Sequence, residues 1–206
     1  MTQATVFVVD DEEAVRDSLQ WLLESSGLQV ALFDSAEAFL QGYDPAQPGC
    51  LVVDVRMPGM SGLEVFEELG RRRCGLPVVF ITGHGDVPMA VSALKQGAVD
   101  FVEKPFGELE MLRVVEQCLR LERETRDRRL QEADTARRLE QLTQREREVL
   151  ELIIVGKLNK QIADVLGISI KTVEVHRARV MEKMGAHSLA ELVQHVVALE
   201  PGAAMR

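Results

Sequence analysis

Five polar side chains that suit phosphoryl chemistry stand just after short apolar segments in the first half of the chain. They are a pair of neighbouring aspartates, a third aspartate, a threonine and a lysine: Asp10, Asp11, Asp54, Thr82 and Lys104. If the apolar segments are parallel strands of one sheet, their carboxyl ends lie along one edge, where such sheets place binding and chemistry. The spacing therefore predicts that these residues meet in one site.

The chemistry of such a site follows from its donor groups. Three carboxylates at one edge repel one another, and a bound cation relieves that repulsion. Mg²⁺ takes carboxylate oxygens as ligands while water completes its octahedron. The Lys104 ammonium is a point charge suited to a phosphoryl group, and Thr82 adds a hydroxyl. A carboxylate nucleophile, a metal, a lysine and a hydroxyl together indicate phosphoryl transfer through an aspartyl phosphate.

The elements that would position these residues follow from the hydrophobic pattern. The apolar segments, rich in Val, Ile and Phe without a period of two, are typical of parallel strands covered on both faces. They are 5–9, 29–33, 51–53, 78–81 and 99–102, and helical patterns follow at 14–24, 36–40, 63–72, 87–96 and from 109 onward. Ser61 with Glu64 forms a capping box, and Gly27 and Gly97 occupy helix C-cap positions. These features predict an α/β fold with a doubly wound, five-stranded parallel sheet.

The segment that follows the predicted sheet is strongly charged and lacks Gly and Pro. Its Glu and Arg spacing favours a solvated helix, while Leu121, Leu130 and Leu139 do not supply the repeating apolar heptad of a coiled coil. We therefore predict a semi-rigid helical linker over 121–141, between domains at 1–120 and 142–206.

Residues 143–199 carry four short helical patterns. The expected N-caps are Thr143 (with Glu146 in a capping box), Asn159, Ser169 and Ser188, and the expected stops are Gly156, Gly167 and Gly185. In the third helix, Ile170, Val173, Val180 and Met184 are spaced for a core. A tight turn at 166–169 before a basic helix predicts an all-α helix-turn-helix domain.

Charge is distributed unevenly between the two halves. The net charge is −9, yet residues 143–206 carry 9 Lys+Arg against 8 Asp+Glu, while residues 1–142 carry 15 against 25. This asymmetry suggests different partners for the two domains. The three cysteines are widely spaced, as expected for free thiols in the cytoplasm, and no segment resembles an export signal or a membrane span.

Four motifs in the first domain can be compared with known families: VVDD at 8–11, VDVRMPGMSG at 53–62, TGHGD at 82–86 and KPF at 104–106. Together they resemble the receiver domain of two-component response regulators, especially the FixJ branch. The resemblance covers about residues 4–120 and implies a flavodoxin-like fold with strand order 2-1-3-4-5. It also implies that Asp54 accepts a phosphoryl group from a sensor histidine kinase, and that no further enzymatic turnover occurs beyond slow autodephosphorylation.

The resemblance assigns the other site residues as well. It implies that Thr82 and Lys104 contact the phosphoryl group, and that Phe101 is the switch aromatic that turns inward when Thr82 moves. The implied ligands of Mg²⁺ (or Mn²⁺) are Asp10, Asp11, Asp54 and the backbone carbonyl of Arg56. A cis Lys104–Pro105 peptide bond is expected, and the helix that carries Val91 and Lys95 would form a homodimer on phosphorylation.

The second domain has motifs of its own: LTxRE at 142–146, GxxNKxIA at 156–163, LGIS at 166–169 and KTVxxHR at 171–177. They resemble the LuxR-type output domain of the NarL/FixJ family over about residues 139–199. The resemblance implies binding to double-stranded promoter DNA, cooperation with RNA polymerase and activation of transcription. Its implied phosphate contacts are Asn159, Lys160, Lys171, Thr172, His176 and Arg179.

Helical spacing adds the groups that could read bases. Glu174, Val175 and Ala178 fall on the face opposite the predicted core. Positive charge around that face is expected from Lys171, Arg177, Arg179 and Lys183. A glutamate there can accept from cytosine N4, and a valine can touch a thymine methyl group.

Two other classes of protein share parts of this pattern. An aspartyl-phosphate phosphatase usually has a second aspartate two residues after its nucleophile, where this chain has Val55 and Arg56. A flavodoxin-like FMN carrier would need a Ser/Thr/Gly-rich loop after the first strand, where this chain has DDEEAVRD. Both classes are less consistent with the sequence than a phosphorylation-switched transcription factor.

Overall fold

The computed structural model describes residues 3–83 and 87–199, without the side chains of 87–90 and 198–199. The chain divides into two compact units, Met1–Arg126 and Asp127–Arg206. No helix in the described ranges combines the length and the apolar character needed to cross a membrane.

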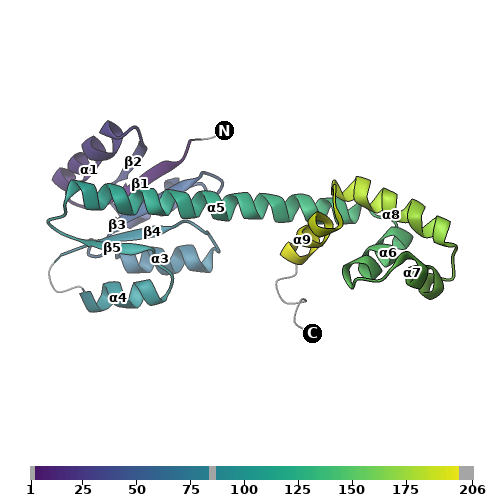
Figure 1. Ribbon diagram of the computed structural model, residues 1–206. Coiled ribbons are helices and arrows are strands. Elements are labelled where there is room, and N and C mark those ends of the chain that lie inside the picture. Colours follow the sequence, from purple (N-terminus) through teal and green to yellow (C-terminus); the bar gives the residue numbers. More distant parts are fainter. Residues whose placement is uncertain (1–2, 84–86, 200–206) are drawn as a thin grey trace. The chain divides into compact units, whose positions relative to one another are not determined.

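The first unit is built on a five-stranded parallel sheet (Figure 1). Its strands are β1 (Thr5–Val9), β2 (Gln29–Phe33), β3 (Gly49–Asp54), β4 (Val78–Thr82) and β5 (Asp100–Glu103). They lie in the order β2-β1-β3-β4-β5, which confirms the predicted fold class and strand order. The central strands β1, β3 and β4 are buried along their whole length, in keeping with their near-continuous apolar sequences.

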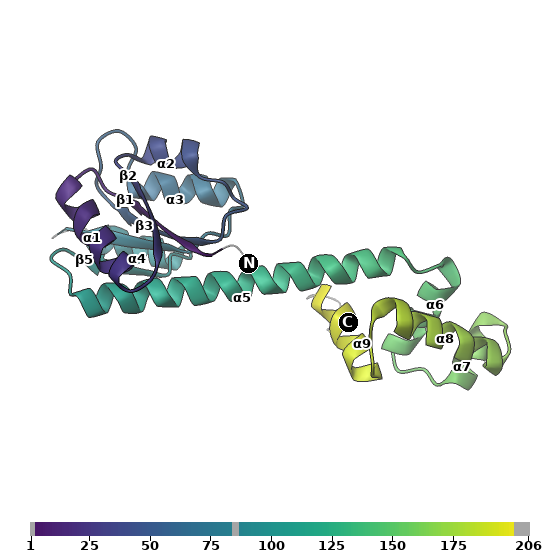
Figure 2. The ribbon, with the colours of Figure 1, turned by 90° about the horizontal axis from the view of Figure 1, so that it is seen from above.

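Helices cover both faces of the sheet (Figures 1 and 2). They are α1 (Glu13–Ser25), α2 (Ala36–Gly42), α3 (Gly62–Arg71), α4 (Val87–Lys95) and α5 (Glu108–Glu140). The core on one face joins α2, α3 and α4 to the sheet through residues such as Phe39, Val65 and Phe80. The core on the other face joins α1 and α5 through Leu19 and Val115. Each βα unit thus buries one apolar helix stripe, as in other doubly wound sheets.

Register brings the ends of the strands together. Val9 of β1 pairs with Val53 of β3, and Asp54 pairs with Ile81 of β4. Asp10 and Asp54, which follow Val9 and Val53, therefore lie side by side at the carboxyl edge, with Thr82 one position beyond Ile81. Gly62, the first residue of α3, makes this edge compact, because a β-carbon there would lie 2.2 Å from the Asp54 carbonyl oxygen.

Over its described residues, up to 199, the second unit contains the last turns of α5 and four further helices. These are α6 (Gln144–Ile154), α7 (Asn159–Leu166), α8 (Ile170–Met184) and α9 (Leu189–Leu199). Val149, Ile162, Val173, Met184 and Leu192 form its fully or almost fully buried core. The predicted linker 121–141 lies almost entirely within α5, and the division between the two units falls inside that helix.

Most predicted helix ends are confirmed. Both capping boxes, Ser61 with Glu64 and Thr143 with Glu146, are present, and Ser169 and Ser188 cap the helices that follow them. The prediction for Asn159 is wrong: α7 begins at Asn159 itself, and Leu158 is the N-cap. The reason is that the Gln161 side chain accepts a hydrogen bond from the backbone N–H of Leu158 at 2.9 Å.

One predicted core position is also wrong. Val173, Val180 and Met184 are buried as expected, but Ile170 is 46% exposed. Ile170 is the first residue of α8, so it projects from the end of the helix, and Ile168 in the preceding turn packs against the core instead.

Candidate functional site

Three carboxylates converge at the carboxyl edge of the sheet. Oxygen atoms of Asp10, Glu12 and Asp54 all lie within 4.8 Å of one another. Asp10 follows β1 and is fully buried, Asp54 ends β3 and is 6% exposed, and Glu12 is exposed before α1. Two of the three negative charges are therefore shielded from water, which makes a neighbouring positive charge necessary.

Lys104 supplies that charge. Its Nζ atom lies 2.7 Å from Asp54 Oδ2, 2.9 Å from Asp10 Oδ2 and 3.1 Å from Glu12 Oε1. Partial burial alone would lower the pKa of Lys104, but its hydrogen bonds to the carboxylates outweigh burial and raise the pKa above its ordinary value. The Lys104–Pro105 peptide bond is cis, as predicted.

Backbone hydrogen bonds hold the two buried aspartates in place. Asp10 Oδ1 accepts from the Glu12 N–H at 2.9 Å, and Asp54 Oδ1 accepts from the Arg56 N–H at 3.1 Å. Burial raises the pKa of Asp10, although its hydrogen bonds to Lys104 and Glu12 act in the opposite direction. The carboxylates are thus oriented before any ligand arrives.

The two predicted switch residues lie on neighbouring strands. Thr82 ends β4, is fully buried, and donates its hydroxyl hydrogen to the Gly83 carbonyl oxygen at 3.1 Å. Phe101 on β5 pairs with Phe80 and packs, partly buried, against the core that contains α4. Thr82 and Phe101 therefore lie on adjacent strands, and Phe101 lies on the side of the sheet that α4 covers.

The structure and the sequence differ over one acidic neighbour. Asp11, predicted as a metal ligand, is exposed and is not a member of the cluster of three carboxylates, whereas Glu12 is. Spacing along the chain could not decide which of the two side chains joins the cluster. That depends on the path of the loop after β1, which is held by the hydrogen bond from the Glu12 N–H to the Asp10 carboxylate. The run of four acidic residues at 10–13 was the only signal for Glu12.

The donor set fits a hard divalent cation. Carboxylate oxygens from Asp10, Asp54 and Glu12 converge, and Arg56, whose carbonyl is a ligand implied by the family resemblance, comes two residues after Asp54. Oxygen donors with several positions left for water are what Mg²⁺ requires.

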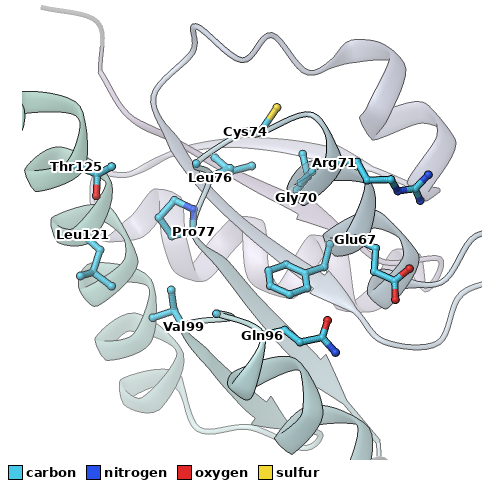
Figure 3. Close-up of a pocket in the computed structure, with 14 residues that line it drawn as sticks. Glu67, Gly70, Arg71, Cys74, Leu76, Pro77, Gln96, Val99, Leu121 and Thr125 are labelled. Carbon is cyan, nitrogen blue, oxygen red and sulfur yellow. The ribbon is translucent and has the colours of Figure 1, made fainter. Parts of the chain in front are cut away.

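A separate cavity of about 790 Å³ lies in the first unit, beside the starts of β4 and β5 rather than their ends. Figure 3 shows Leu76, Pro77 and Val99 at this cavity, with Arg71 from α3 and Leu121 from α5 around it. Its lining contains none of the residues of the acidic cluster, so it is not part of the phosphoryl-transfer geometry.

Helix α8 presents one polar face to solvent. Its core side is formed by Val173, Val180 and Met184, and its exposed residues include Lys171, Glu174, Val175, Ala178 and Arg179. Thr172 is half-buried and its hydroxyl lies 2.8 Å from the Ser169 hydroxyl. His176 is half-buried, and its covered Nδ1 atom makes no hydrogen bond within the described residues.

The remaining predicted DNA contacts lie at the start of α7, where Asn159 is half-buried and Lys160 is exposed. The expectation that Lys183 adds positive charge around the exposed face of α8 needs correction. Its ammonium lies 2.6 Å from the buried Glu146 carboxylate, so its charge is compensated inside the domain.

The candidate dimer residues lie on α4. Val91 is 40% exposed, and Lys95, one turn later, is also exposed. An exposed valine beside a lysine is available for contact with a partner.

A receiver-type sheet with this acidic edge, followed by a helix-turn-helix unit, defines the class of response regulators with a DNA-binding output domain. Comparisons with known proteins agree. Residues 6–116 match the response regulator receiver domain, and residues 140–196 match the bacterial regulatory proteins of the luxR family.

Relatives match the chain over nearly its whole length. It is 51% identical to the transcriptional regulatory protein FixJ of Azorhizobium caulinodans, with 92% of this chain and 90% of the relative covered. It is 47% identical to FixJ of Rhizobium meliloti, with 96% and 97% covered. Among solved structures, the response regulator StyR superposes with a TM-score of 0.84 at 49% identity, covering 94% of this chain and 98% of that one.

The chain therefore belongs to the NarL/FixJ family of two-component response regulators, in its FixJ-like branch. It is a transcriptional regulator with a receiver domain and a LuxR-type DNA-binding domain.

Proposed function

We propose that this regulator is switched by phosphorylation of Asp54. In this proposal a sensor histidine kinase in the cytoplasm donates the phosphoryl group, and the phosphorylated chain dimerises, binds promoter DNA and activates transcription with RNA polymerase. The observation that carries the proposal is the Asp54 carboxylate, nearly buried, 2.7 Å from the Lys104 ammonium and grouped with Asp10 and Glu12.

The transfer is a displacement at phosphorus. A carboxylate oxygen of Asp54 attacks the phosphorus atom of a phosphohistidine, the P–N bond breaks, and its electron pair returns to the imidazole nitrogen, which takes up a proton. Lys104 stays close enough to Asp54 to move from the carboxylate oxygen to a phosphoryl oxygen. Hydrolysis reverses the state: water attacks the phosphorus, and Asp54 leaves as a carboxylate beside inorganic phosphate.

Asp10, Asp54 and either Glu12 or Asp11, with the Arg56 carbonyl, would hold the Mg²⁺ (or Mn²⁺) ion. When bound, the ion would supply positive charge to the phosphoryl oxygens during transfer. The chain's own residues orient the nucleophile: the Arg56 N–H fixes one oxygen of Asp54, and Lys104 fixes the other.

The response to phosphorylation passes through the neighbouring strand ends. The Thr82 hydroxyl would leave the Gly83 carbonyl for the phosphoryl group, and Phe101 would turn inward beside it. The surface of α4 with Val91 and Lys95 would then form the homodimer. A dimer places two α8 helices on half-sites about one helical turn of DNA apart, so its operator should be a pseudo-palindrome.

Within each output domain, the exposed face of α8 is the part that enters the major groove. Lys171, Thr172, His176 and Arg179 would contact phosphates, together with Asn159 and Lys160 of α7, and Glu174, Val175 and Ala178 would face base edges. We propose no enzymatic activity on an external substrate, since Asp54, the carboxylate that attacks the phosphoryl donor, is itself the group that is modified.

The decisive experiment is phosphorylation by acetyl phosphate, followed by intact-protein mass spectrometry. We expect the wild-type chain to gain one phosphoryl group in the presence of Mg²⁺ and none after chelation. Asp54→Asn should gain none, while the matched control Asp17→Asn, an exposed aspartate of α1, should behave as wild type. Incorporation that survives in Asp54→Asn would overturn the assignment of Asp54.

A further inference from the structure

The last turns of α5 are part of the DNA-binding unit. Leu139 and Leu142 pack against the core that contains Val173 and Met184 of α8, and Thr135 is buried. The apolar contacts show that the C-terminal end of α5 is folded into this core rather than loosely tethered to it.

Arg138 connects α5 directly to the end of α8. Its Nη1 atom donates a hydrogen bond of 2.9 Å to the carbonyl oxygen of Met184, the last residue of α8. Its Nε atom donates at 2.7 Å to Asp134, one turn earlier on α5. A cation at a helix C-terminus satisfies a carbonyl that has no partner within the helix and is favoured by the helix dipole.

Gly185 shows how close this approach is. It ends α8 with φ +62°, and a β-carbon added there would lie 1.8 Å from Arg138 Nη1. Gly156, which also has a positive φ of +77°, has no atom within 4 Å of such a β-carbon. Two features therefore favour glycine at position 185. The backbone has a positive φ, and the Arg138 side chain occupies the space that a β-carbon would need.

Other cations close the same junction. Lys183 of α8 donates to the Gln141 carbonyl at 3.1 Å, just after the end of α5. Arg147 of α6 donates to the carbonyls of Glu140 and Leu142, each at 3.3 Å. Side chains from α6 and α8 thus cap the C-terminal end of α5, so that the three helices meet at one point.

We propose that Arg138 is a positioning residue for DNA recognition, which couples the orientation of α5 to that of α8. Through this contact, a change in the orientation of α5 would reach α8 directly at the Met184 carbonyl, and not only through the helices that lie between them. The proposal rests on the proposed function, because the change in α5 would originate in the phosphorylated receiver domain.

The test compares two neighbouring arginines in the full-length chain. Arg137 and Arg138 both pair with Asp134, but only Arg138 donates to α8. Arg137→Ala and Arg138→Ala therefore remove the same charge from the same turn. The DNA probe is a duplex selected from a random pool by the beryllofluoride-treated wild-type chain. The Kd of each variant for this duplex is measured with and without beryllofluoride, at a temperature well below the unfolding midpoint of that variant.

We expect beryllofluoride to tighten binding by about tenfold or more in the wild type and in Arg137→Ala, a typical size for coupling between sites. In Arg138→Ala the gain should fall to within about twofold, and Arg138→Lys, which keeps a donor at this position, should restore part of it. A gain in Arg138→Ala equal to that of Arg137→Ala, whatever its melting temperature, would overturn the proposal and leave Arg138 with a purely structural role. Absence of any gain in the wild type would instead count against the proposed phosphorylation switch.

A second measurement stands even if Arg138→Ala is poorly folded. Gly185→Ala should lower the unfolding midpoint more than Gly156→Ala does, because only Gly185 faces the Arg138 side chain. It should also reduce the beryllofluoride-dependent gain while Gly156→Ala preserves it. Equal effects of the two glycine substitutions on both measurements would contradict the role given to this contact.

Discussion

The ammonium group of Lys183 lies 2.6 Å from the carboxylate of Glu146 and joins the last turn of α8 to the first turn of α6. Glu146 is only 2% exposed and also accepts a hydrogen bond from the Thr143 N–H in its capping box. The hydrogen bond from Lys183, helped by those in the capping box, outweighs burial and lowers the pKa of Glu146 to about 2. This pair is therefore a stabilising element of the DNA-binding domain whose strength depends on pH.

The first prediction is an acid-dependent loss of stability that requires this pair. The folded-state pKa lies below the ordinary value of 4.5, so the stabilisation is complete above pH 4.5 and is lost as the pH falls toward 2. A shift of this size corresponds to about 2–3 kcal/mol in the free energy of unfolding, after some reduction for solvent near Lys183. Urea unfolding of the full chain, monitored by helical circular dichroism, measures it over this pH range.

Lys183→Met provides the comparison. It leaves the Glu146 carboxylate buried without its cation, so we expect about 2–4 kcal/mol lower stability at pH 7. Between pH 4.5 and 2 its stability should fall less than that of the wild type. Lys171→Met, an exposed lysine on the same helix, should retain the wild-type pH profile. A wild-type profile in Lys183→Met would show that the pair does not control acid stability.

The second prediction separates the two candidate ligands next to Asp10. Glu12 belongs to the carboxylate cluster and Asp11 does not, so Glu12→Gln should weaken divalent-ion binding more than Asp11→Asn. Loss of a direct carboxylate ligand should cost at least the roughly tenfold in affinity that is typical for loss of an outer-shell partner of a metal ligand. Mn²⁺ binding followed by electron paramagnetic resonance measures this directly, and Glu13→Gln is the neighbouring control. Weaker binding in Asp11→Asn alone would restore the ligand set inferred from family resemblance.

The sheet and the main residues of the acidic site were predictable for one physical reason. Parallel strands buried on both faces leave continuous apolar segments, and their polar end residues must share an edge. Asp10, Asp54, Thr82 and Lys104 followed from that rule, and the structure brings Lys104 to both aspartates. The choice between Asp11 and Glu12 did not follow, because a single hydrogen bond decides how the loop turns.

Errors in the second domain have the same origin in contacts that spacing does not encode. Periodicity placed Ile170 in the core, but the cap at Ser169 turns the chain so that Ile168 packs there instead. Glu146 was recognised as a capping residue, while its partner Lys183, 37 residues later, was assigned to the DNA-facing charge. Local patterns predict helix starts well, whereas pairing between helices depends on the assembled fold.

The third prediction concerns dimerisation. A negative charge at Val91 should block the dimer that we propose for the phosphorylated state, because a half-exposed valine at a contact would be replaced by a charge that must lose water. Sedimentation velocity with beryllofluoride should therefore show a monomer for Val91→Glu and a dimer for the wild type. Val165→Glu, at an exposed valine of α7, carries the same change in charge and should still dimerise.

Phosphorylation of Asp54 serves as the internal check on this variant. Because Val91 is exposed, Val91→Glu should keep the wild-type unfolding midpoint and accept the phosphoryl group from acetyl phosphate. A joint loss of phosphorylation and stability would mean that Val91 is needed for folding. A normal dimer would remove α4 from the interface.

The fourth prediction distinguishes phosphate contacts from base contacts on α8. Lys171 lies in the first turn of the helix and is exposed, so Lys171→Ala should weaken binding to all DNA sequences alike. It should also reduce the slope of log affinity against log salt concentration by about 1, as expected for the loss of one phosphate contact. Glu174→Ala should instead change the preferred base at one position of each half-site, with a discrimination of about 1–3 kcal/mol lost.

Glu151→Ala, an exposed glutamate of α6 with the same change in charge, should alter neither the salt slope nor the base preference. Selection of bound duplexes by each variant, followed by titration at several salt concentrations, measures both quantities. If Glu174→Ala keeps the wild-type base preference while Lys171→Ala changes it, the assignment of the two residues to phosphates and bases must be reversed.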